Sequence, residues 1–152
     1  MSAGWRCRAT RSGCRELTRN PALIPDAVEE VLRCEPPTYH FCRWVVKDTE
    51  FHGQTVPAES ILVVVPPAAN RDESKWEDTD RFDVHRQPGQ IFTFSFGPHF
   101  CQGANLARIE ARIALETILP VIPDWTADLD HAELTAGIDT RGWDTLPVET
   151  TA

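Results

Sequence analysis

Apolar residues recur at helical spacing in two parts of the chain, and each part is bounded by residues that start or stop a helix. The first predicted helix runs from Pro25 to about Cys34, with Asp26 as its cap and with Pro36 and Pro37 beyond its end. Its apolar positions are Ala27, Val28, Val31 and Leu32. The second predicted helix begins near Gly103 and ends at about Leu119, before Pro120. One stripe of this helix carries Ala107, Ala111, Ala114 and Ile118, and another carries Arg108, Arg112 and Glu116.

Between these helices the pattern changes to short runs of β-branched and aromatic residues. Residues 43–46, 49–51 and 61–65 are separated by turn-forming residues, which predicts strands of one small sheet. Residues 66–93 lack periodicity and are rich in Asp, Asn, Pro and Gln, so we expect a structured meander. The end of the chain, with its glycines and Pro147, indicates short strands or turns. The predicted fold class is therefore mainly α with small β-sheets.

Composition and charge add two constraints. With 152 residues, 41% of them hydrophobic, the chain is long enough to form one core. The formal net charge is −8, yet residues 1–20 contain five arginines against one glutamate, a balance of +4 that leaves −12 for the rest. We therefore separate a divergent basic segment, residues 1–14, from residues 15–152. The acidic remainder argues against a nucleic-acid partner.

Apolar runs are too short to span a bilayer, and the beginning of the chain has no apolar signal core. No membrane association and a cytoplasmic location are the expectations that follow.

The stretch with the most chemical information lies just before the second predicted helix, from Phe94 to Gly103. A thiolate at Cys101 would face the positive end of the helix macrodipole, which stabilises the anion and suits it to ligate iron. Gly97 would let a flat macrocycle approach the backbone, and Gly103 would allow a tight turn into the helix. The aromatic residues Phe94, Phe96 and Phe100 would exclude water from the sulfur, and exclusion of water tunes a metal–thiolate site.

The spacing of Phe94, Gly97, Cys101 and Gly103 resembles the haem-binding signature of the cytochromes P-450. The resemblance extends from about Arg15 to Val148, and it implies haem b with Cys101 as its thiolate iron ligand. It also implies the C-terminal part of the cytochrome P-450 fold: a Glu-x-x-Arg helix, a small sheet, the meander, the cysteine loop, a long helix and C-terminal strands.

A second motif supports the same family. Glu30 and Arg33 lie three apart, on one face of the first predicted helix, where they can pair. In the family this pair is buried and is locked by an arginine of the meander, for which Arg81 is the first candidate and Arg86 the alternative. Family members also bind the haem propionates through basic residues, and Arg43 and His99 occupy those positions. Two carboxylates at an apolar haem edge require such cationic donors.

The resemblance further implies a monooxygenase that inserts one oxygen atom of O2 into a small organic substrate. The electrons would come from a ferredoxin-type or other redox partner on the proximal face. Family members are more than twice as long, and the helix that supplies their oxygen-activating acid and alcohol has no counterpart here, so no catalytic residue is assigned. A non-catalytic haem-binding module and a truncated, inactive gene product remain as alternative interpretations.

Overall fold

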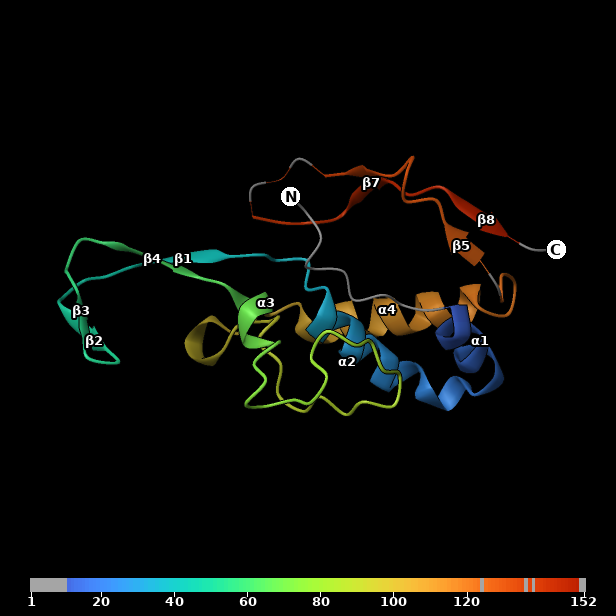
Figure 1. Cartoon of the computed structure of the whole chain (residues 1–152), viewed down its shortest axis with the longest axis horizontal. Helices are drawn as coiled ribbons and strands as arrows, with labels where there is room; N and C mark the ends of the chain where they lie inside the picture. The colour runs from blue at the N-terminus through green and yellow to red at the C-terminus, as the bar shows by residue number, and fades with distance from the viewer. Residues whose placement is uncertain (1–10, 124, 136, 138, 151–152) are drawn as a thin grey trace.

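The computed structural model describes residues 11–123, 125–135, 137 and 139–150 (Figure 1). The N-terminal half contains helix α1 (Arg11–Arg19), the 3-10 turn η1 (Pro21–Leu23), helix α2 (Ile24–Cys34), strands β1 (Phe41–Trp44), β2 (Thr49–Phe51), β3 (Gln54–Val56) and β4 (Ile61–Val64), and the short helix α3 (Pro66–Ala69). The C-terminal half contains the 3-10 turn η2 (Gly97–His99), helix α4 (Ala104–Ile118) and strands β5 (Trp125–Ala127), β6 (Glu133–Leu134), β7 (Trp143–Thr145) and β8 (Val148–Thr150).

Helices α2 and α4 lie side by side and form the centre of the molecule (Figure 1). Both helices were predicted with nearly their observed bounds, but the predicted cap of α2 is wrong. Leu23 is the N-cap residue and makes no side-chain capping bond, whereas Asp26 lies in the first turn. There its charge is favourable because it faces the positive end of the helix.

The core lies where α1, α2 and the end of α4 meet. Its buried residues are Leu17, Ile24, Ala27, Val28, Val84 and Leu119. Helix α4 contributes Ala111 and Leu115 to the edge of this core, while the predicted stripe residues Ala114 and Ile118 are exposed. The face of α4 that packs inward is therefore rotated from the predicted one.

The predicted single small sheet is instead two separate antiparallel pairs. Strand β1 pairs with β4, with Trp44 opposite Ile61, and β2 pairs with β3 as a hairpin. His52 and Gly53, both at positive φ, form the two-residue turn of that hairpin. Strand β3 is polar and was not predicted.

The stretch from α3 to the cysteine loop is an ordered meander, as predicted, and Asn70 fixes it from within. The buried Asn70 amide donates to Thr93 Oγ1 at 2.9 Å and accepts from the Phe92 N–H at 2.7 Å. Thr93 in turn donates to the Leu32 carbonyl of α2 at 2.6 Å. The meander is thereby attached to α2 by polar contacts.

Helix α1 also packs against this meander. A Cβ at Gly13 would lie 3.7 Å from Val84 and 4.0 Å from Phe82, and His85 Nε2 lies 2.7 Å from Glu16 Oε1. The boundary predicted between residues 14 and 15 falls inside this continuous helix.

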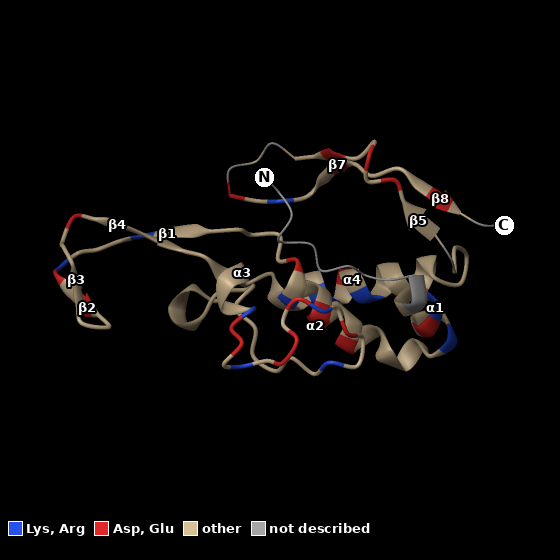
Figure 2. Cartoon of the chain, in the orientation of Figure 1, with Lys and Arg blue, Asp and Glu red and all other residues tan. Residues whose placement is uncertain are grey.

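The last strands form two further antiparallel pairs, β5 with β8 and β6 with β7. Segment 37–39 joins them to the rest of the molecule: the Tyr39 N–H donates to the Asp139 carbonyl and the Arg141 N–H to the Pro37 carbonyl. Lys and Arg are spread over several elements, and in the meander they alternate with acidic residues (Figure 2). Among the described residues, no helix is both long and apolar enough to cross a membrane.

Candidate functional site

Glu30 and Arg33 form a fully buried ion pair at the centre of a polar network. Arg33 Nε lies 2.8 Å from Glu30 Oε2, and both side chains have zero exposure. Arg33 Nη2 also donates to Glu30 Oε1 at 3.0 Å. The guanidinium further donates to carbonyl oxygens of the meander, at Asn70 (2.9 Å), Thr79 (2.9 Å) and Arg81 (3.3 Å). These hydrogen bonds satisfy the buried pair and hold the meander against α2.

The third member of this network is Arg86, not Arg81. Arg86 Nε lies 3.1 Å from Glu30 Oε1, and the Arg86 side chain is only 14% exposed. The Arg81 side chain is 69% exposed and lies 4.0 Å from Asp83, so Arg81 joins the network only through its backbone carbonyl. The first candidate was therefore wrong and the alternative is the residue that contacts Glu30.

The cysteine loop is fixed by its own backbone. The Cys101 N–H donates to the Phe94 carbonyl at 2.9 Å, and the Cys101 carbonyl accepts the Ala104 N–H at 3.2 Å, where α4 begins. Cys101 is exposed and is a free cysteine. The thiol is thus presented to solvent just ahead of the positive end of a 15-residue helix.

Two glycines lie in the cysteine loop. Gly97 has a φ of +66°, which L side chains rarely adopt, and nothing lies within 4 Å of the position of a Cβ. A Cβ on Gly103 would lie 3.8 Å from Cys101 Sγ. Ser95, with a φ of +65°, occupies a left-handed conformation that glycine would adopt more readily.

Of the three phenylalanines that were expected to exclude water from the sulfur, only Phe94 is buried. Phe94 is 9% exposed, whereas Phe96 is 68% and Phe100 is 51% exposed. The latter two are exposed and therefore do not form the expected cover.

Arg108 of α4 joins the loop to α2, a role that the sequence did not suggest. Its guanidinium forms two hydrogen bonds with the carboxylate of Glu29, through Nε to Oε1 and through Nη2 to Oε2 at 3.0 Å. The same group lies 4.7 Å from the centre of the Phe94 ring. Glu29 and Arg108 are 79 residues apart, so no local spacing could have indicated this contact.

The two predicted propionate ligands lie on different elements. Arg43 lies on β1, where its guanidinium stacks 4.4 Å from the Phe41 ring centre and donates to the Cys42 carbonyl. His99 is exposed at the end of η2. Both contacts of Arg43 lie within β1, so the pairing of Arg43 and His99 on one ligand stays a prediction.

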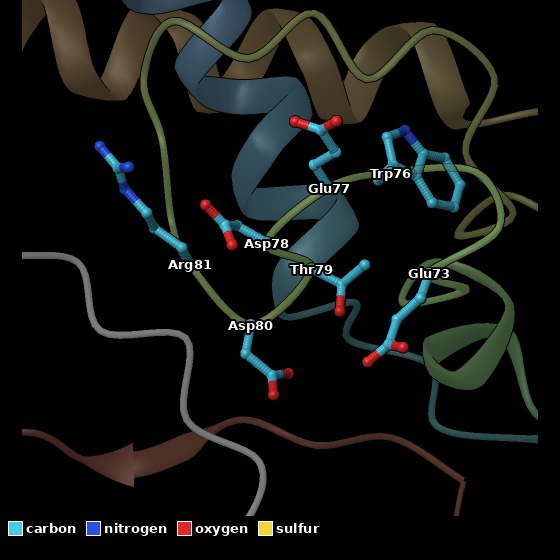
Figure 3. A pocket seen from close by; sticks show the side chains of 7 residues that line it. All are labelled: Glu73, Trp76, Glu77, Asp78, Thr79, Asp80 and Arg81. Atoms are coloured by element: carbon cyan, nitrogen blue, oxygen red, sulfur yellow. The ribbon is translucent and has the colours of Figure 1, made fainter.

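An open hollow of about 810 Å³ lies in the meander and not at the cysteine loop. Its lining side chains belong to one stretch, residues 73–81, and four of them are acidic (Figure 3). Asp80 among them is paired with Arg71 at 2.7 Å. Cys101 does not line this hollow.

Comparison with known proteins gives the class to which this fold and thiol site belong. The family model described as cytochrome P450 matches residues 17–120, and the chain belongs to that family. The predicted family is therefore confirmed.

Curated relatives include a monooxygenase and a hydroxylase/epoxidase. The chain is 39% identical over 118 residues to a steroid C26-monooxygenase of Mycobacterium tuberculosis, which covers 78% of this chain and 32% of the relative. It is also 39% identical over 138 residues to the mycinamicin IV hydroxylase/epoxidase of Micromonospora griseorubida, covering 88% of this chain and 35% of the relative. The chain thus spans about a third of the length of these relatives.

Solved structures agree with this assignment. Cytochrome P450 PksS of Bacillus subtilis superimposes with a TM-score of 0.88 at 31% identity, covering 93% of this chain and 37% of that one. CYP109E1 of Bacillus megaterium, solved in complex with testosterone, gives a TM-score of 0.86 at 29% identity, covering 93% and 40%. The predicted fold, a C-terminal portion of the cytochrome P-450 fold with few helices and small antiparallel sheets, is confirmed.

Proposed function

We propose that this chain is the haem-binding portion of a cytochrome P-450 monooxygenase, with Cys101 as the thiolate ligand of the iron. The observation that carries the proposal is the exposed Cys101 thiol, held ahead of α4 by the backbone bond to Phe94, with Gly103 beside the sulfur and open space at Gly97 in the same loop. A buried structural cysteine at a turn would instead be covered by apolar neighbours.

The residues around the thiol fit a flat, largely apolar macrocycle. The open space at Gly97 permits a close approach to the backbone, and exposed Phe96 and Phe100 offer apolar contact area. Arg43 and His99 would provide cations for the propionates. The haem, when bound, would supply the activation of O2 from which one oxygen atom enters an organic substrate.

The contribution of the chain itself is to hold the sulfur in one position just ahead of α4, at the end of the helix that carries the positive pole of the macrodipole. As the ligand of a bound haem, the Cys101 sulfur would supply electron density to the iron. The buried network of Glu30, Arg33 and Arg86 fixes the meander that lies against α2.

Substrate and partner follow from the class. Relatives named as a steroid C26-monooxygenase and as a mycinamicin IV hydroxylase/epoxidase support a small organic substrate. We propose a ferredoxin-type or other redox partner on the proximal face as the electron source. A cytoplasmic location also stays a prediction.

The test is to express residues 1–152, add haem, reduce the iron and bind carbon monoxide. A strongly red-shifted Soret band is expected, and Cys101→Ala should abolish it because alanine cannot ligate iron. Cys42→Ala is the matched control, since Cys42 is also free and exposed but lies on β1. A band that survives in Cys101→Ala, or that is lost equally in Cys42→Ala, would contradict the assignment.

Activity is tested separately by adding a redox system and an organic substrate. Bound haem with the thiolate spectrum but no oxidised product would favour the second candidate, a haem-binding module without monooxygenase activity.

A further inference from the structure

Three segments that are distant in sequence meet at Arg108. Helix α4 provides Arg108, α2 provides Glu29, and the cysteine loop provides Phe94. The guanidinium forms a two-bond fork with Glu29, while its Cζ atom lies over the Phe94 ring, 4.7 Å from the ring centre. A planar cation suits both contacts at once, since the edge donates and the face stacks.

The surroundings make this contact stronger than an ordinary surface ion pair. The side chains of Arg108 and Glu29 are 31% and 27% exposed, and the Phe94 ring beneath them is buried. The hydrogen bonds that Arg108 donates to Glu29, opposed only in part by burial, raise the pKa of Arg108 above its ordinary value. By contrast, Arg112 and Glu116 on the same helix are each 48% exposed and 3.5 Å apart.

Phe94 leads directly to the thiol. Its carbonyl accepts the Cys101 N–H at 2.9 Å, and the Cys101 carbonyl accepts the N–H of Ala104, which is buried and lies one turn before Arg108. The loop is therefore attached to α4 at its end and through the Phe94 ring near its start. A shift of that ring would move the backbone group that holds Cys101.

We propose that Arg108 is a positioning residue for Cys101: held by Glu29, it clamps the Phe94 ring and so fixes the hydrogen bond that orients the cysteine. As a role in catalysis, this inference rests on the proposed function of Cys101 as the iron ligand. Arg108 would also couple α2 to the cysteine loop, because a displacement of Glu29 would move Arg108 and, through it, the Phe94 ring.

Hydrogen exchange of the haem-free chain, followed peptide by peptide, tests the clamp without any cofactor. Arg108→Gln should increase exchange in the peptide containing residues 94–103 by about tenfold, the scale of a partly buried cation–π contact. Exchange in β1 should not change. Arg108→Lys, which keeps the charge but loses the fork, should give a smaller increase, and Arg112→Gln should give none.

Unchanged exchange of the loop in Arg108→Gln would overturn the proposal. So would an equal rise in every peptide, because it would mean that Arg108 only stabilises the fold. If Arg108→Gln fails to fold, Arg108→Lys is used instead. Its exchange in residues 94–103 is then compared with that of the unsubstituted chain and with that of its other peptides.

A second readout uses the haem-loaded chain. Arg108→Gln should reduce the share of the reduced carbonyl complex that shows the red-shifted band, whereas Arg112→Gln should not; an unchanged share in Arg108→Gln would count against the proposal. If the unsubstituted chain shows no such band, the proposed function fails, while the exchange experiment still decides whether Arg108 positions the loop.

Discussion

Arg86 and Arg81 lie five residues apart in the meander and differ completely in what their side chains do. Arg86 neutralises part of the charge of Glu30, which has no access to water. Arg86→Gln should lower the free energy of unfolding by about 2–3 kcal/mol, because a buried carboxylate loses a charged hydrogen-bond donor. Urea denaturation monitored by circular dichroism measures this loss.

Arg81→Gln is the matched control. The Arg81 side chain is mostly exposed, and its contact with Arg33 is made by the backbone carbonyl, which glutamine retains. Its effect should be within about 0.5 kcal/mol. Equal losses for the two variants would show that Arg86 is not the residue that Glu30 requires.

At this scale the sequence predicted residue types and spacings better than contacts. Cys101, Gly97 and Gly103 were identified because their spacing is local, and in the structure a Cβ on Gly103 would lie 3.8 Å from the Cys101 sulfur. The choice between Arg81 and Arg86 depended on which side chain turns inward from an irregular loop, and no periodicity describes such a loop. Arg108 was assigned to a polar stripe because its partner Glu29 is 79 residues away.

Among the elements, the turn that follows β5 contains a pH-sensitive contact. Asp128 Oδ2 lies 2.6 Å from His131 Nδ1, and this hydrogen bond is the main cause of a pKa of Asp128 below its ordinary value of 3.8. Because the folded pKa is depressed, the contact stabilises the fold above pH 3.8, and this stabilisation is lost as pH falls through the lower folded value.

NMR titration of the Asp128 carboxyl carbon measures this shift. In His131→Ala, the pKa of Asp128 should return toward 3.8, because the hydrogen bond that lowers this pKa most is removed. A carboxyl that titrates at the same pH with and without His131 would contradict the prediction.

Helices were predicted more accurately than strands for a physical reason. Helix α2 carries four apolar residues at helical spacing and ends before two prolines, so local pattern determines it. Strand β3, with the sequence Gln-Thr-Val, forms because the turn at His52 and Gly53 folds it back on β2. Helix α1 carries few apolar residues, and it is supported by contacts with the meander that sequence alone does not reveal.

Across the whole molecule, one face of α4 is apolar and exposed. Leu106, Ile109 and Ile113 recur at spacings of three and four and are 59%, 47% and 51% exposed. Phe96 and Phe100 of the cysteine loop are exposed as well, at 68% and 51%. Exposed apolar side chains that gather in one patch are sites where an apolar ligand or partner can bind.

The isolated chain should therefore bind the apolar dye 8-anilinonaphthalene-1-sulfonate. The double substitution Ile109→Lys and Ile113→Lys should reduce dye fluorescence, because charged side chains interrupt the stripe. Glu110→Lys, on the same helix, should leave it nearly unchanged. Dye binding that is equal in all three proteins would place the apolar surface elsewhere.

The contacts of Arg33 also bear on how the meander can diverge. Arg33 recognises three carbonyl oxygens, and every amino acid supplies a carbonyl, so these contacts impose a path on the chain without imposing side chains. A substitution at position 81 should therefore leave these contacts intact, whereas a substitution at position 70 should remove the hydrogen bonds of the Asn70 amide. Related proteins should keep the backbone path of this segment while its side chains differ.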